Sequence, residues 1–387
     1  MSHKPTPINA PFWTPGTLVM LALMFGAAVT LVFRYTYGLS AVTNLDNHYP
    51  WGIWIGLDVA SGVALAAGGF TTAFLAHILG RHTYEAITRP ALLTAALGYT
   101  FVAIAVFVDI GRSWAIWKAV IYQNHNSALF EVAMCVMTYV AVLWIEFIPV
   151  LAEKLGGKIP LLAFLDRILD QTMWVFIILG VVLSCMHQSS LGTLLVIAPT
   201  KMSALWYTPL QPLLFLTSAF AVGYPMVVVE TTIATSSLRL ESEMEILAPL
   251  SRITVLLLGI YMIIKLGDLV YREAYVTLLD GSAQSNSFLV EVGLGVVLPW
   301  LMLLFRKVRE TRRLLFIAGL LVVAGVMLNR FNVFVVSFHA PYATTPYYPA
   351  IGEILVTVGA VATIFFLYRV FVTHFPVLSA RRQGVSR

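Results

Sequence analysis

Ten apolar stretches, each long enough to cross a lipid bilayer, divide this chain of 387 residues. A spanning helix needs about 20 mostly apolar residues, and inside the hydrocarbon layer it must satisfy its backbone hydrogen bonds internally. The stretches lie near residues 14–34, 51–80, 89–111, 127–150, 170–198, 209–236, 247–271, 285–305, 313–333 and 350–372. This pattern predicts an all-α polytopic membrane protein with ten transmembrane helices.

The composition and the charge distribution agree with this fold class. Hydrophobic residues make up 59% of the chain and charged residues 11%, compared with about a quarter charged residues in soluble proteins. Assigning loops to alternate sides puts seventeen of the 24 lysines and arginines on the side that holds both chain ends. The positive-inside rule then places both ends in the cytoplasm. The net charge of +5 reflects topology, and we expect no nucleic acid partner.

The N-terminal sequence MSHKPTPINAPFWTPG lacks the pattern of a cleavable signal peptide, so the first apolar segment is expected to remain in the protein. Cys135 and Cys185 both lie in apolar runs, and two cysteines can build neither a disulfide framework nor a cysteine-ligated iron–sulfur cluster. A bis-histidine haem needs two facing histidines at matching depth. Within the spans, only His77 and His187 are available, and they lie toward opposite sides. We therefore expect no haem and no metal site in this chain.

An internal repeat appears when the chain is shifted by 160 residues. Arg112, Asn126, Ser127, Leu129, Glu131 and Val132 then coincide with Arg272, Asn286, Ser287, Leu289, Glu291 and Val292. The shift predicts two parallel-repeat four-helix bundles, formed by the second to fifth and the sixth to ninth spans, with the first and tenth spans flanking them. The predicted regions are 1–50 (N-terminus, first span and outer loop), 51–200 (first bundle), 201–335 (second bundle) and 336–387 (tenth span and basic tail).

Ionisable side chains gather in the outer half of the first predicted bundle. Such groups inside a span cost roughly 2.5–3.5 kcal/mol each on insertion scales, so they normally face the bundle interior and find partners. Asp109 and Arg112 are three residues apart, so on one helical face they can pair. With Asp58, Glu131 and His187 they come from four neighbouring spans, which predicts one buried polar pocket.

The segment CMHQSSLG, residues 185–192, interrupts an apolar span with polar side chains. Histidine titrates near neutral pH and can exchange protons with a bound molecule. A quinone needs such a site, because its two carbonyl oxygens take up protons while its tail lies in lipid. We predict a quinone pocket in which protons are exchanged by His187, Asp58, Asp109 and Glu131. Its expected quinone contacts are Arg112, Trp114, Gln188 and Ser189.

Two further sets of polar residues lie in the spans. The predicted second bundle carries a polar cluster for which a structural ion-pair network is as good an explanation as a direct role: Lys265, Asp268, Arg272, Glu291, Arg330 and Glu353. Glu146 and Glu230 lie toward the cytoplasmic half and form a candidate proton path. For these two acids we favour the alternative of carboxylates that pair helices.

Several long motifs resemble a known family of membrane subunits. They read YPWGIWIGLDVASGVALAAGGF, TRPALLTAALGYTFVAIAVFVDIGRSW, NSALFEVAMCVMTYVAVLWIEFIP, MHQSSLGTL and LNRFNVFVVSF. They are similar to the integral membrane subunits of the NrfD/PsrC family. Within it they resemble most the HybB type, which accompanies nickel–iron hydrogenase, and the related HmcC type of multihaem cytochrome complexes. The resemblance covers the second to tenth spans.

The resemblance implies a quinone-reactive subunit, with menaquinone favoured, that has no redox cofactor of its own and lies in the bacterial inner membrane. It implies a partner on the periplasmic side, an iron–sulfur subunit of the four-cluster ferredoxin type, which connects to a nickel–iron hydrogenase or multihaem cytochrome c subunits. Two alternatives remain open at this point. Ten spans, a repeat and buried ion pairs also occur in secondary transporters, and a loop histidine could complete a haem b site.

Overall fold

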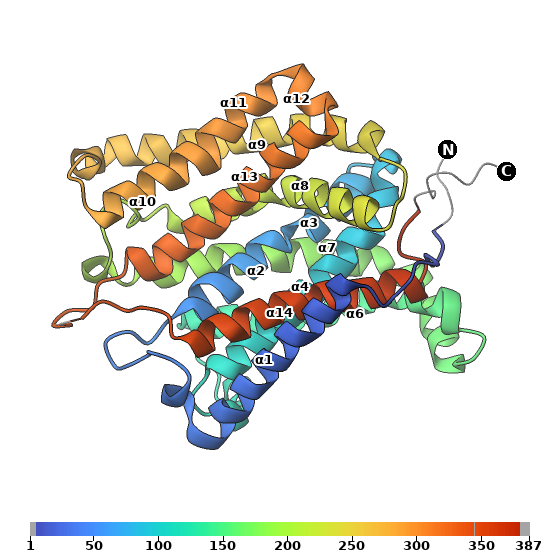
Figure 1. Ribbon diagram of the computed structural model, residues 1–387, viewed down its shortest axis with the longest axis horizontal. Coiled ribbons are helices and arrows are strands. Elements are labelled where there is room, and N and C mark those ends of the chain that lie inside the picture. Colours follow the sequence, from blue (N-terminus) through green and yellow to red (C-terminus); the bar gives the residue numbers. More distant parts are fainter. Residues whose placement is uncertain (1–4, 344, 380–387) are drawn as a thin grey trace.

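The computed structural model of the chain describes residues 5–343 and 345–379. It contains ten helical segments that are long and apolar enough to cross a membrane, which confirms the predicted all-α fold. Figure 1 shows them side by side along one common direction.

Six of the spans in the described residues are single α-helices. The other four are built from consecutive α-helical and η segments, where η marks a 3₁₀ or π helix. The spans are, in order, α1 Pro15–Tyr37; η2 Trp54–Val59, α2 Ala60–Leu65, α3 Ala67–Ala73 and η3 Phe74–Ile78; η4 His82–Tyr84 and α4 Glu85–Asp109; α6 Ala128–Leu155; α7 Pro160–Val196; α8 Gln211–Ser237; α9 Met244–Tyr271; α10 Ala283–Val292, η8 Gly293–Val297 and α11 Leu298–Leu304; α13 Arg312–Phe331 and η9 Asn332–Val336; and α14 Ile351–His374. Short connecting helices are η1 Leu39–Ala41, η5 Ser113–Ala115, α5 Lys118–Ile121, η6 Pro199–Lys201, η7 Ala274–Thr277 and α12 Arg306–Glu310.

Local sequence signals fix where several helices begin. Thr14 caps α1 and exchanges hydrogen bonds with Thr17, while Pro15 occupies the first helical position. The hydroxyl of Ser127 accepts a hydrogen bond from the backbone N–H of Phe130 at the start of α6. A side-chain oxygen at such a position satisfies a backbone donor that the helix itself leaves free.

The second span lies at the centre of the bundle, where Figure 1 shows α2 and α3 surrounded by other helices. Buried residues make up 83% of its apolar window, compared with 17% in α1. It packs against α4 and α8. Small residues allow this close approach: a Cβ atom added to Gly69 would lie 2.5 Å from the Cβ atom of Ala95. The second span therefore positions residues for contact with both halves of the molecule.

The two halves of the chain share a wide interface and are not separate in the structure, so the division into two repeated bundles remains a prediction. α8 packs against α3 and α7 as well as against α9 and α13. The first and last spans, α1 and α14, pack along each other at one side of the molecule (Figure 1).

Both ends of the described chain lie on the same side of the bundle, at the right of Figure 1. Backbone N–H groups of Thr6 and Ile8 donate to the carbonyl oxygens of Leu378 and Val372, both at 3.1 Å. An even number of spans requires this arrangement. Four basic residues assigned to this side lie outside the described residues: Lys4, Arg381, Arg382 and Arg387. The assignment of this side to the cytoplasm stays a prediction.

Four π-helical segments widen the spans locally: η2, η3, η8 and η9. Such turns often occur at functional positions. In this chain η2 carries Asp58, η8 begins two residues after Glu291, and η9 begins at Asn332. The regular helix is thus interrupted beside three polar residues that lie within spans.

We predict that Gly325→Ala lowers the stability of the protein by about 1–3 kcal/mol, the usual range for overpacking. A Cβ atom on Gly325 would lie 2.4 Å from the Cα atom of Gly295, so α13 and η8 would have to separate. The measurement is the midpoint of thermal unfolding in detergent. Gly293→Ala is the matched control, because nothing lies within 4 Å of its added Cβ atom. Equal midpoints for the two variants would contradict this packing.

Candidate functional site

His187 is fully buried in the first half of the molecule, with 0% of its surface exposed. Its Nδ1 atom lies 3.4 Å from the hydroxyl oxygen of Tyr99 on α4. The ring of Tyr99 packs edge-on against Tyr139 of α6, with 4.5 Å between the ring centroids. Nε2 of His187 has no hydrogen-bond partner among the residues that the structure describes. The histidine is thus held through one ring nitrogen, and the other nitrogen is free for a further contact.

Neighbouring residues of α7 build the rest of this polar site. Ser184, three residues before His187, and Gln188, the residue directly after it, lie one turn apart on α7, and both face the hydroxyl of Tyr99. The side-chain amide of Gln188 donates to the carbonyl oxygen of Val63 at 2.9 Å, which ties α7 to α2. Ser189 instead turns its hydroxyl to the carbonyl oxygen of Cys185 in its own helix, at 3.4 Å.

Glu131 lies in the first turn of α6, next to this site. The hydroxyl of the buried Ser190 donates to Oε1 of Glu131 at 2.6 Å. Ser190 follows His187 by three residues, about 4.5 Å along the helix axis. The side chain of Glu131 is exposed in the isolated chain. The predicted grouping of Glu131 with the CMHQSSLG segment therefore agrees with a direct contact.

Asp58 and Asp109 face a different part of the molecule. Oδ2 of Asp58 accepts a hydrogen bond of 2.7 Å from the hydroxyl of Thr357 on α14. Asp58 and Asp109 lie within electrostatic range of each other, and Asp109 is also within range of Arg34 and Glu353. These carboxylates point toward α1 and α14, whereas His187 lies among α2, α4, α6 and α7. The single predicted pocket is thus divided into two neighbouring sites.

The expected pairing of Asp109 with Arg112 is wrong. α4 ends at Asp109 and the chain leaves the helix through an extended residue, Ile110, so the two side chains do not share a helical face. Among the ion pairs of the described residues there is none between them. Arg112 is exposed, and Trp114 is 71% exposed in the connection between α4 and α6. The chain alone places neither residue beside His187.

A second correction concerns Glu353, which does not join the polar cluster of the second half. Its carboxylate accepts hydrogen bonds from the backbone N–H groups of Asn44 and Ala350, at 3.2 and 2.8 Å, and from the hydroxyl of Tyr347. Burial and the bond to Glu353 raise the pKa of the Tyr347 phenol, so it remains a donor. The indole N–H of Trp54 donates to the carbonyl oxygen of Glu353 at 3.1 Å. Glu353 thus caps α14 beside the Asp58 site.

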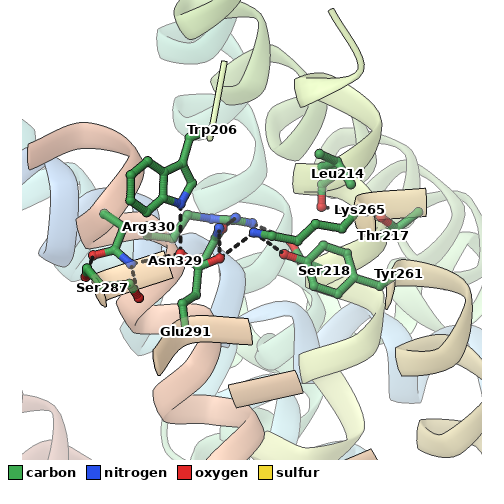
Figure 2. A network of polar contacts seen from close by, with 11 residues as sticks. Trp206, Leu214, Thr217, Ser218, Tyr261, Lys265, Ser287, Glu291, Asn329 and Arg330 are labelled. Carbon is green, nitrogen blue, oxygen red and sulfur yellow. Dashed lines mark hydrogen bonds and ion pairs between the residues drawn. The ribbon is translucent and has the colours of Figure 1, made fainter. Parts of the chain in front are cut away.

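The remaining residues of the second cluster form a dense buried network, drawn in Figure 2. Its centre is Glu291, which pairs with Lys265. Oε2 of Glu291 also accepts from the indole N–H of Trp206 at 2.8 Å, and the amide of Asn329 donates to Oε1 at 2.8 Å. Asn332 adds a fourth donor at 2.8 Å. Four donors satisfy this carboxylate, which is what burial of a charge requires.

Two arginines extend the network. The buried Arg330 donates to Asn329 and Ser218, at 2.7 and 2.8 Å, and its guanidinium lies 3.7 Å from the ring centroid of Phe215. Arg272 forms an ion pair of 2.8 Å with Asp268 one turn earlier on α9. Among the predicted second-bundle residues, Lys265 therefore pairs with Glu291 and Arg272 with Asp268. Arg330 instead binds Asn329 and Ser218, two residues outside the predicted cluster.

Two cavities border these elements. A cavity of about 10 Å³ beside Lys265, Asp268 and Arg272 has room for about one water molecule. A groove of about 600 Å³ lies between α1 and the start of α14, lined by Thr30, Phe33 and residues 40–44 and 349–352. Neither cavity touches His187. Within residues 5–343 and 345–379, no three His, Cys, Asp or Glu side chains are grouped to hold a metal ion.

Glu146 and Glu230, the candidate proton path, lie at separate interfaces. Glu146 belongs to the interface of α6 with α7: a Cβ atom on Gly180 would meet its Oε1 atom at 2.9 Å. It is also within electrostatic range of Tyr139. Glu230 of α8 faces Thr94 and Tyr368, on α4 and α14. The two acids therefore do not form one continuous path with each other through the contacts described.

Sequence reasoning missed the partners that hold these groups. Tyr99 and Tyr139 stand in apolar runs, where aromatic side chains are common, and nothing in the sequence marks them. Trp206 lies in a loop. Asn329 and Asn332 are the exception, because the polar run LNRFN in an apolar span was a usable signal.

The helices and buried polar clusters define a polytopic membrane protein with three polar sites inside its spans, around His187, Asp58 and Glu291. Residues 41–340 match the family model described as polysulphide reductase, NrfD. The chain belongs to the NrfD family.

Three relatives extend the comparison. The probable Ni/Fe-hydrogenase 2 b-type cytochrome subunit of Escherichia coli strain K12 is 32% identical over 99% of this chain and 97% of its own length. A protein of Nitratidesulfovibrio vulgaris strain Hildenborough is 36% identical over 98% of this chain and 97% of its own length. The integral membrane subunit of menaquinone reductase from the same organism is 30% identical over 45% of this chain and 42% of its own length.

We predict that Lys265→Met destabilises the protein by about 3–5 kcal/mol, because it leaves the buried carboxylate of Glu291 without its ion-pair partner. The double variant Lys265→Met/Glu291→Gln removes both charges and should recover much of this loss. Lys118→Met, at an exposed position, is the control. The measurement is thermal unfolding in detergent, and a double variant no more stable than the single variant would refute the coupling.

Proposed function

We propose that this chain is the quinone-reactive membrane subunit of a respiratory oxidoreductase complex. The observation that carries the proposal is the buried His187, held through one ring nitrogen, in a member of a family that has a menaquinone reductase membrane subunit among its relatives. A buried imidazole in an apolar surrounding is suited to exchange a proton with a quinone oxygen. Menaquinone is the favoured substrate.

Oxidation of a quinol releases two electrons and two protons. In our proposal the electrons pass to a redox centre of a partner subunit on the outer side, an iron–sulfur protein of the four-cluster ferredoxin type. One proton goes to Nε2 of His187 and the second to a carboxylate, for which Asp58, Asp109 and Glu131 are the candidates. Glu131 is favoured by its hydrogen bond to Ser190, one turn from His187. Reduction of a quinone reverses these transfers.

The assembly follows from the same proposal. The iron–sulfur partner would connect this subunit to a nickel–iron hydrogenase or to multihaem cytochrome c subunits, and the name of the Escherichia coli relative supports the hydrogenase. The excess of basic residues on the side of the chain ends supports cytoplasmic termini in the bacterial inner membrane. Glu146 and Glu230 lie at separate interfaces, so a cytoplasmic proton path would run through one of these acids and not through both.

We predict that His187→Ala lowers the rate of electron exchange between 2,3-dimethyl-1,4-naphthoquinol and the redox centres of the co-purified complex by at least about 100-fold, the usual scale of general acid–base catalysis. The control is His77→Ala, which makes the same change at an exposed histidine in the last segment of the second span, away from His187. It should leave the rate unchanged. Both variants should assemble with their partners. A normal rate for His187→Ala in the assembled complex would reject the proposed site.

A haem b cytochrome is the second candidate, because the relative from Escherichia coli is named a b-type cytochrome subunit. Two axial histidines must face each other across the haem. In this chain His77 is exposed in η3, near the side of the chain ends, whereas Nδ1 of the buried His187 faces Tyr99 nine residues before the opposite end of α7. These two histidines therefore do not form the axial pair of one haem.

We therefore expect the visible spectrum of the chain, purified free of cytochrome subunits, to lack a Soret band. The spectrum of the whole complex serves as the positive control for any haem in its partners. A Soret band that remains with the isolated chain and disappears in His187→Ala would establish the cytochrome instead.

A further inference from the structure

The hydroxyl of Tyr99 lies at the centre of the polar site in the first half. It contacts Nδ1 of His187 at 3.4 Å and also faces Ser184 and Gln188, which are one turn apart on α7. The exposed fraction of Tyr99 is 0%. Three of the side chains around this hydroxyl thus come from a single helix, α7, and the tyrosine comes from α4.

The orientation of Tyr99 is fixed by packing. Tyr139 from α6 stacks against it edge-on, with an interplanar angle of 84°, and is itself 1% exposed. On the other side, the hydrogen bond from Gln188 to the carbonyl oxygen of Val63 holds α7 against the second span. Four spans therefore determine where the hydroxyl lies, and it cannot leave His187 without repacking.

The two ring nitrogens of His187 consequently differ in their surroundings. Nδ1 is directed to Tyr99, while Nε2 has no partner among the residues that the structure describes. A neutral imidazole carries its proton on one nitrogen and accepts at the other, and the hydrogen bond made by one nitrogen determines the state of the other. A tyrosine hydroxyl can accept from Nδ1–H or donate to Nδ1.

From this geometry we propose that Tyr99 is the positioning residue of His187: it holds Nδ1 so that Nε2 is the nitrogen that exchanges the proton with the quinone. The inference rests on the proposed function. When Nε2 takes a proton from a quinol hydroxyl, Nδ1 keeps its hydrogen and donates it to the Tyr99 oxygen. When Nε2 returns that proton to a quinone oxygen, Nδ1 again keeps its hydrogen and its hydrogen bond to Tyr99. The phenol itself neither gains nor loses a proton.

Loss of the hydroxyl in Tyr99→Phe keeps the ring and its packing against Tyr139 but removes the hold on Nδ1. We expect the rate of electron exchange with 2,3-dimethyl-1,4-naphthoquinol to fall at least about tenfold, because a misplaced proton-transfer group loses rate steeply. Binding of the quinone analogue 2-heptyl-4-hydroxyquinoline N-oxide, followed by fluorescence quenching, should keep its Kd, because Tyr99 does not touch the quinone in this proposal. A purely structural role of Tyr99 would change both quantities.

Tyr224→Phe is the matched control, since it removes a buried hydroxyl that donates to the carbonyl oxygen of Thr71, away from His187. It should change neither the rate nor the Kd. A parent-like rate for Tyr99→Phe, or a loss of analogue binding equal to its loss of rate, would overturn the positioning role. The proposed function fails separately, if His187→Ala keeps the parent rate. A complex in which His187→Ala is inactive and Tyr99→Phe is fully active would therefore reject the positioning role alone.

Discussion

A carboxylate inside a hydrocarbon layer has no water to solvate it, and the second half of this molecule is arranged around that constraint. Glu291 is surrounded by an ammonium group and three nitrogen donors. Those donors come from α9, the loop before α8, and the ninth span, so satisfying one charge brings these elements together. Breaking such a pair leaves an uncompensated buried charge, which costs more than the pair contributes as a whole. The register of these helices is thereby fixed.

In the first half of the molecule, several buried polar atoms lack a hydrogen-bond partner among the described residues. Buried atoms of Ser61, Ser184, His187 and Gln188 have no hydrogen-bond partner in the described part of the chain. Buried polar groups in folded proteins are nearly always paired, and the exceptions call for an explanation such as a bound molecule or a catalytic role. The carboxylate of Glu291 in the second half is satisfied by side chains of the same half, although Nε of Arg330 and Oε1 of Glu230 have no partner among the described residues. The polar site around His187 has several unpartnered atoms in one place and therefore has capacity for an external group.

The sequence was sufficient for the number of spans, because the bilayer imposes length and apolarity on each of them. It was also sufficient for the burial of His187 and for the contact of the segment CMHQSSLG, through Ser190, with Glu131. It failed where a prediction needed a helix boundary, since the pairing of Asp109 with Arg112 assumed that α4 continued past Asp109. It failed again for Glu353, because sequence order does not tell which neighbours the tenth span meets. The tyrosines at positions 99 and 139 were invisible among lipid-facing aromatics.

The pairing of α1 with α14 has a consequence for assembly. The first span to enter the membrane has its main packing partner in the last one, so it must wait in lipid while eight other spans are inserted. Because most of the apolar surface of α1 is exposed even in the folded chain, this helix can remain in contact with lipid until α14 is inserted. Asp58 shares the delay, because Thr357 belongs to the tenth span. A ribosome that stops before the end of the gene would therefore leave a membrane protein in which the carboxylate of Asp58 lacks its hydrogen-bond donor, Thr357.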